Sequence, residues 1–232
     1  MRKYRLSSLI GSTLVIFSSY FVLQAADKQL SPSKTHLKPL LLKAGKSIVS
    51  ETFDKDSTLV QSWAKYGTQW KVVNGVLVGS PSSLDYQANH PGKLSGANPR
   101  MQVNVPICKQ GFILKFDFKS DKKVERASFW LGHHRFKLLI KDNQPSLQHF
   151  KSKKKVVTTA LKPINGPMKD NQWYSVMMET HGTHRVVQIS GFEPLIVEAF
   201  PLTKISPVRI SGSKGETIHL DNFQFIEGAG LL

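Results

Sequence analysis

The chain has 232 residues, of which 40% are hydrophobic, so it is long and apolar enough to fill one core and is not a disordered polymer. Its single cysteine excludes a disulfide within the chain. Its formal net charge of +16 makes anionic partners the expected ones, with basicity that serves no specific partner as the alternative.

The first 26 residues have the order of a secretory signal peptide. A short basic start is followed by a mostly apolar run and then by the small residues Ala25 and Ala26. An uncleaved membrane anchor is the alternative. The prediction is a secreted or periplasmic protein, and export makes nucleic acid an improbable partner despite the charge. Acidic polysaccharide is the better expectation.

Residues 27–50 are rich in lysine and contain two prolines, which predicts a basic linker, part of which has enough apolar content to pack as an edge segment. The domain is predicted to span residues 51–228. Its first element is a hairpin over 69–80, where Asn74-Gly75 suits a type I′ turn because both residues tolerate positive φ.

Later segments keep the period of two that is typical of strands. Residues 111–120 alternate between apolar and polar, residues 125–143 predict two strands that bend near Gly132, and residues 171–200 predict a pair that turns at 181–183. Strands over 207–213 and 218–228 close the chain, and no segment has a sustained helical period. The fold class expected is all-β, a two-sheet β-sandwich of the jelly-roll type.

Several short stretches resemble bacterial domains of the 3-keto-disaccharide hydrolase group. The resemblance covers about residues 51–228, including the strand pair near Trp173 and the last strand, and its opening motif is carried by Phe53, Asp54, Trp63, Trp70, Val72, Gly75 and Leu77. It implies a concanavalin A-like jelly roll, and it implies glycoside hydrolysis as one function to be weighed.

The stretch that most resembles a binding site is the strand that begins near residue 125. Arg126, Ser128 and Trp130 share one face by the strand period. A tryptophan beside an arginine and a serine can stack on a sugar ring and bond its hydroxyls. Lys115 and Asp117, on the polar side of another strand, are expected to join them, and His134 is expected at the rim. The alternative is that Trp130 fills the core.

Catalytic and metal-binding residues are harder to assign. No E-x-D-x-x-E string of a sandwich hydrolase is present, so the nearest candidate acids are Asp117 and Glu125, with a solvated turn as the alternative. Oxygen ligands from Glu51, Asp54 and Asp221 predict a calcium site if the ends of the domain adjoin. The alternative is that Asp221 caps a turn. No other cofactor is expected.

Three functions follow from these patterns. The first is an exported domain that binds glycan, possibly anionic, on a concave sheet face. The second is a glycoside hydrolase of the 3-keto-disaccharide type. The third is a structural or adhesive surface module without a small ligand.

Overall fold

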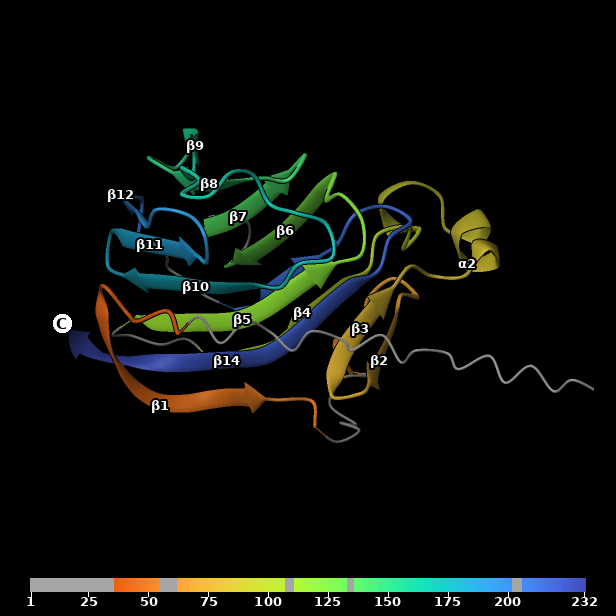
Figure 1. The fold of residues 1–232 in the computed structure, drawn as a ribbon, viewed down its shortest axis with the longest axis horizontal. Coiled ribbons are helices and arrows are strands. Elements are labelled where there is room, and N and C mark those ends of the chain that lie inside the picture. The colour runs from red at the N-terminus through yellow and green to blue at the C-terminus, as the bar shows by residue number, and fades with distance from the viewer. Residues whose placement is uncertain (1–35, 55–61, 107–110, 133–135, 202–205) are drawn as a thin grey trace, which may run out of the picture. The chain divides into compact units, whose positions relative to one another are not determined.

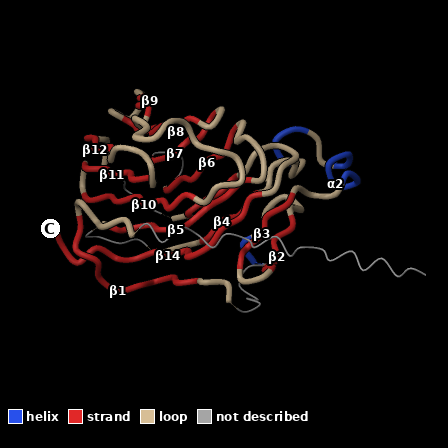
Figure 2. The backbone as a smooth tube through the Cα atoms, in the orientation of Figure 1, coloured by secondary structure: helices blue, strands red, loops and turns tan. Residues whose placement is uncertain are grey.

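The computed structural model describes residues 36–54, 62–106, 111–132, 136–201 and 206–232 (Figure 1). Strands make up most of this backbone (Figure 2), which is the arrangement predicted from the alternating segments. The strands form two antiparallel sheets, and the fold is a two-sheet jelly-roll sandwich. No helix in the described ranges is long and apolar enough to cross a membrane.

The larger sheet has eight strands in the order β12-β11-β10-β5-β14-β3-β2, with β1 also paired to β14. Its strands are β1 (Leu42–Glu51), β2 (Gln69–Val73), β3 (Val76–Ser80), β5 (Phe112–Ser120), β10 (Tyr174–His181), β11 (His184–Ile189), β12 (Leu195–Glu198) and β14 (Ile218–Leu231). β14 is long enough to pair with β3 near its start and with β1 over the rest of its length.

The smaller sheet has six strands in the order β4-β13-β6-β7-β8-β9. Its strands are β4 (Arg100–Val103), β6 (Arg126–Leu131), β7 (Phe136–Lys141), β8 (Gln144–Phe150), β9 (Val156–Ala160) and β13 (Val208–Ser211). The β6–β7 hairpin confirms the predicted bend near Gly132, and the β10–β11 hairpin confirms the predicted turn at 181–183.

The core lies between the sheets and follows from strand alternation. Phe112, Leu114, Phe116 and Phe118 of β5 all face it and are at most 1% exposed. The ring centroids of Phe116 and Phe129, which belong to opposite sheets, lie 4.7 Å apart. Burial of such aromatic side chains supplies most of the stabilisation of a sandwich.

The early hairpin forms as predicted. Asn74 and Gly75 connect β2 to β3 with φ values of 51° and 76°, the left-handed conformation that a type I′ turn requires. Between this hairpin and β4 lies a short helix that the sequence analysis did not predict, α2 (Leu84–Asn89), followed by one 3₁₀ turn (Gly92–Leu94). The side chain of Ser83 caps α2 by accepting a hydrogen bond from the Tyr86 amide.

The expectation that part of residues 27–50 packs as an edge segment is confirmed, and the sheet therefore begins before residue 51. Leu42–Glu51 is strand β1, paired antiparallel to β14, and Leu42 is fully buried. The exposed Lys43 and Lys46 gave this segment a linker-like composition, although Ile48 and Val49 pack against the core. The predicted signal peptide and residues 27–35 of the predicted linker lie outside the described residues.

Candidate functional site

The outer face of the six-stranded sheet has a row of polar side chains. On β6, Ala127, Phe129 and Leu131 are buried in the core, so the alternate residues Arg126, Ser128 and Trp130 face outward, as the sequence predicts. Trp130 is half-buried on this outer face and does not belong to the core cluster. The alternative in which it fills the core is wrong.

Strand register brings further side chains to Trp130. Arg209 of β13 lies opposite Trp130 on one side, and Lys137 of β7 lies opposite it on the other. Gln102 of β4 lies opposite Arg209 and extends the row to a fourth strand. A second row, two residues along the strands, contains Arg100, Ser211 and Ser128.

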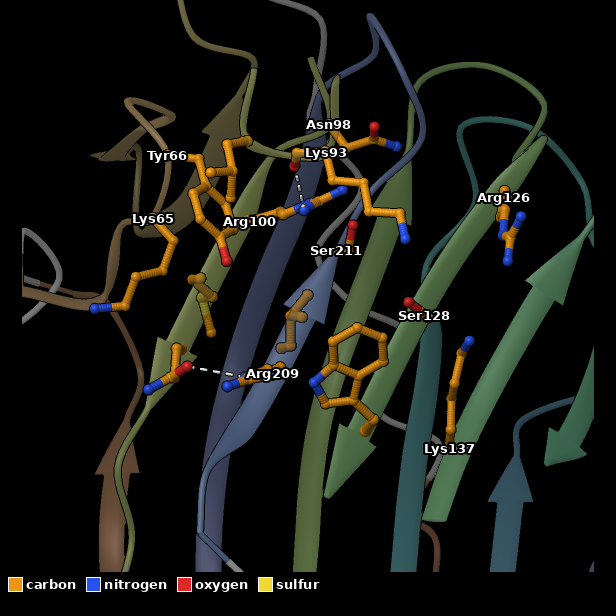
Figure 3. A pocket seen from close by; sticks show the side chains of 15 residues that line it. Lys65, Tyr66, Lys93, Asn98, Arg100, Arg126, Ser128, Lys137, Arg209 and Ser211 are labelled. Carbon is orange, nitrogen blue, oxygen red and sulfur yellow. Dashed lines mark hydrogen bonds between the residues drawn. The ribbon is translucent and has the colours of Figure 1, made fainter. Parts of the chain in front are cut away.

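These rows form the floor of a cavity of about 650 Å³. Residues of the 3₁₀ turn and of the segments before β2 and β4 complete its walls (Figure 3). The lining residues are Lys65, Tyr66, Lys93, Leu94, Asn98, Arg100, Met101, Gln102, Arg126, Ser128, Trp130, Lys137, Arg209, Ile210 and Ser211.

The charge of the cavity is one-sided. Six lining side chains are cationic and no described lining residue is acidic; the six are Lys65, Lys93, Arg100, Arg126, Lys137 and Arg209. The ion pairs found in the described parts of the chain involve none of these six. Uncompensated cations held together in a hollow create a positive potential that attracts anions.

Several of the cations are nevertheless held in place. Arg209 Nε donates to Gln102 Oε1 at 2.8 Å, and an Arg100 guanidinium nitrogen donates to the Lys93 carbonyl at 2.9 Å (Figure 3). The Arg100 guanidinium also lies 5.3 Å from the Tyr66 ring centroid. These contacts are with neutral groups, so they orient the cations without cancelling their charge.

Trp130 lies between two cations. Its ring centroid is 5.4 Å from Lys137 Nζ and 6.0 Å from Arg209 Cζ. Burial, and then the charge of Arg126, lower the pKa of Lys137 below its usual value. The charged form of Lys137 is therefore disfavoured in this cavity, and a bound anion would stabilise it.

The structure separates Lys115 and Asp117 from this site. Both lie on β5 of the eight-stranded sheet, and their side chains face outward, away from the core that separates the two sheets. The prediction that they join Trp130 is wrong, because β5 pairs with β10 and β14 and not with β6. Glu125 is exposed just before β6 and does not line the cavity. His134 lies outside the described residues.

Asp117 has a different acidic neighbour from the one predicted. It lies opposite Asp221 in the register of β5 and β14, and Asn222 Nδ2 donates to its Oδ2 at 2.7 Å. Burial, with the charges of Asp117 and Asp54, raises the pKa of Asp221 to about 6, although the amide of Asn222 opposes the shift. Asp117 and Asp221 are thus the opposed carboxylates of this fold, in place of Asp117 and Glu125.

The calcium site is not assembled as predicted. The two ends of the domain do adjoin, since β1 pairs with β14. However, no three acidic, histidine or cysteine side chains of the described chain are grouped so that they could hold a metal ion, and this includes Glu51, Asp54 and Asp221.

Of the six cations that line the cavity, only Arg126 was predicted from the sequence as a site residue. Arg100, Lys137 and Arg209 each alternate with buried apolar neighbours, so the outward position of each was readable. Lys137 comes beside Trp130 through the predicted β6–β7 hairpin. The proximity of Arg100 and Arg209 to Trp130 could not be predicted, because β13 inserts between β4 and β6, which are far from it in the sequence. Lys65 and Lys93 lie outside the strands, so no strand pattern indicated which way their side chains face.

No protein-family model matches the sequence, and neither does the sequence of any curated protein, so the resemblance to 3-keto-disaccharide hydrolases is supported only in its jelly-roll fold. A solved structure described as a sialidase is similar with a TM-score of 0.56 at 8% identity, over 82% of this chain and 19% of that one. The binding domain of botulinum neurotoxin DC in complex with SialylT is similar with a TM-score of 0.53 at 11% identity, over 80% of this chain and 48% of that one. The chain thus spans half or less of the length of these structures, and the likeness establishes that it has their kind of β-sandwich.

Proposed function

We propose that this protein is exported and binds anionic carbohydrate in the cavity on the six-stranded sheet. The observation that carries the proposal is the set of six cations around the half-buried Trp130, without a carboxylate among the described lining residues. A neutral sugar would leave these charges unmatched, whereas a carboxylate, sulfate or phosphate group on a sugar would match them.

The neutral lining groups fit a saccharide as well. Ser128, Ser211, Asn98 and Gln102 offer hydroxyl and amide groups for sugar hydroxyls. Trp130 offers an apolar surface for a sugar ring. A cavity of about 650 Å³ has the size of an ordinary small-ligand site.

The structural neighbours agree with this choice at the level of fold. One is a toxin binding domain in complex with SialylT, and another is described as a sialidase. Fold likeness at this identity does not transfer a ligand. The proposal therefore depends on the cavity, and the predicted signal peptide supplies the extracellular setting in which acidic glycans are available.

A calorimetric comparison of glycans tests the proposal. Sialyllactose and chondroitin sulfate oligosaccharides should bind to the exported protein, and lactose should bind at least about tenfold more weakly. The triple variant Arg100→Gln/Lys137→Gln/Arg209→Gln should lose this binding. The control Lys43→Gln/Lys46→Gln removes two exposed charges from β1 of the other sheet and should keep it.

Salt separates recognition from bare attraction. Binding that persists in part at high salt and still discriminates among anionic glycans supports a built site. Binding that disappears equally for every anion, or that the β1 control variant loses as much as the cavity variant does, would contradict the proposal.

Glycoside hydrolysis is a second candidate, favoured by a separate observation. Asp117 and Asp221 are opposed carboxylates, and the raised pKa of Asp221, about 6, is that of a group able to donate a proton near neutral pH. Turnover of ordinary or 3-keto disaccharides that Asp117→Asn and Asp221→Asn abolish would support it. No turnover together with no glycan binding would leave a structural or adhesive module.

A further inference from the structure

We infer that the ligand of this cavity is a linear polyanionic saccharide that lies across the strands, with a sugar ring at Trp130 and successive anionic groups at two basic clusters on either side. This inference rests on the proposed function and makes it more specific. It distinguishes a polymer whose charges recur along its length from a single charged sugar at the end of a glycan.

The first cluster consists of Arg126 of β6 and Lys137 of β7. Both side chains stand on the same side of the hollow (Figure 3). They are close enough for the charge of Arg126 to lower the pKa of Lys137, and neither forms an ion pair in the described part of the chain. These two cations, with the Ser128 side chain beside them, form a place for one anionic group.

The second cluster consists of Arg100 of β4 and Arg209 of β13, on the other side of the hollow (Figure 3). Each arginine is oriented by a neutral acceptor: Arg100 by the Lys93 carbonyl and Arg209 by Gln102. Each guanidinium keeps further N–H groups available, and a planar guanidinium suits carboxylate and sulfate groups. These two arginines, which lie in neighbouring rows two residues apart along the strands, therefore offer the second cluster's place for an anionic group.

Trp130 separates the two clusters. Lys137 and Arg209 lie opposite it on β7 and β13, so the strands that carry these two cations are separated by β6 alone. With neighbouring strands about 4.8 Å apart, the two cations stand on strands about 10 Å apart. That separation is comparable to the repeat of a disaccharide in an extended polysaccharide, so anions on alternate sugars can reach both clusters while the sugar between them covers Trp130.

A single charged sugar fits the arrangement less well. It can neutralise one cluster, but the other remains uncompensated across the ring of Trp130. A chain that crosses β4, β13, β6 and β7 neutralises both and uses the whole length of the cavity. Linking two charge contacts in one ligand makes the second an intramolecular event, which raises affinity steeply.

The test is a length series. Calorimetry would compare sialyllactose, which carries one carboxylate, with chondroitin sulfate oligosaccharides from one disaccharide upward. We expect affinity to rise by about tenfold or more once the oligosaccharide reaches both clusters, and to level off afterwards. Arg126→Gln/Lys137→Gln and Arg100→Gln/Arg209→Gln should each abolish this rise, whereas Lys43→Gln/Lys46→Gln should preserve it.

Each result decides something. If one disaccharide or sialyllactose binds as tightly as the longer chains, the polymer inference is overturned while the proposed function stands. The inference also fails if each cluster variant weakens short and long ligands by the same factor. If no anionic saccharide of any length binds, both the inference and the proposed function are wrong. Far-ultraviolet circular dichroism and thermal unfolding of the variants verify that the fold is retained.

Discussion

The outer faces of the two sheets differ in whether their charged side chains are paired with opposite charges. On the six-stranded sheet, cations gather around Trp130 with no described acid beside them. On the eight-stranded sheet, acids and bases lie together: Oδ1 of Asp121, just after β5, is 2.9 Å from His219 Nε2 on β14 and 3.8 Å from Lys119 Nζ on β5. Strand alternation gives both sheets a polar outer row, and the neighbouring strands decide whether its charges are balanced.

The two faces also differ in how they are covered. The carboxylate of Glu179, which is fully buried on β10, accepts hydrogen bonds from the amides of Leu40, Leu41 and Leu42 at 2.8, 3.1 and 3.0 Å. Apolar side chains of the same segment pack on Ile113 and Met177. The eight-stranded sheet thus has part of its outer face closed by the chain itself, whereas the six-stranded sheet keeps a hollow.

Two tryptophans give the largest expected contrast. Trp70 is 2% exposed in the core, so Trp70→Ala should lower the free energy of unfolding by about 4 kcal/mol. Trp130 lies on the outer face, so Trp130→Ala should lower it by about 1 kcal/mol or less and should weaken saccharide binding. Urea unfolding and calorimetry measure both effects. Equal losses of stability would contradict the placement of Trp130.

Removal of the Glu179 carboxylate should have the next largest effect. Glu179→Ala leaves three backbone amides without their acceptor, which should cost about 3 kcal/mol of unfolding free energy. Faster hydrogen exchange at Leu40–Leu42 would localise the loss, and Glu179→Gln, which keeps one acceptor oxygen, should lose less. Exchange that is unchanged in Glu179→Ala would show that this segment is held by its apolar contacts alone.

The acidic pair on the eight-stranded sheet predicts a pH effect. The pKa of Asp221 is about 6 in the folded chain against an ordinary value of 3.8, so the folded state holds an extra proton between these values. The contribution of Asp221 to stability should therefore fall as pH rises from about 4 to about 6 and stay lower above that, by about 1 kcal/mol after allowance for solvent screening. The lowered pKa values of His149 and Asp121 act in the opposite direction, so the measurement is the difference between wild type and Asp221→Asn. A difference that does not change over this pH range would refute the assignment.

The smallest effect is expected in the cavity itself. Burial and then the nearby Arg126 disfavour the charged form of Lys137, so Lys137→Gln should raise the free energy of unfolding slightly. The same variant should bind anionic saccharide less tightly. A loss of stability in Lys137→Gln would mean that its contact with Trp130 outweighs the repulsion.

The fold was more accessible from the sequence than the site. Alternation around Phe116 and the Asn74-Gly75 turn are local signals, and both predict the strands that form. The direction in which Trp130 points is also local. Lys137 comes beside it through the predicted β6–β7 hairpin, whereas Arg209 depends on strand order, and the separation of Asp117 from Trp130 depends on which sheet receives β5. Periodicity carries no information on either.

The position of strand β13 in the sheet affects the order in which the cavity forms during folding. Only four residues long, it lies between β4 and β6 and supplies Arg209 to the cavity from a position more than a hundred residues after Arg100. Pairings between such distant parts of a chain form slowly, because the entropy of closing the loop is lost before the contacts stabilise the chain. The proposed affinity for an anionic saccharide should consequently appear late during refolding, after the hairpins have formed, and its appearance would report that the fold is complete.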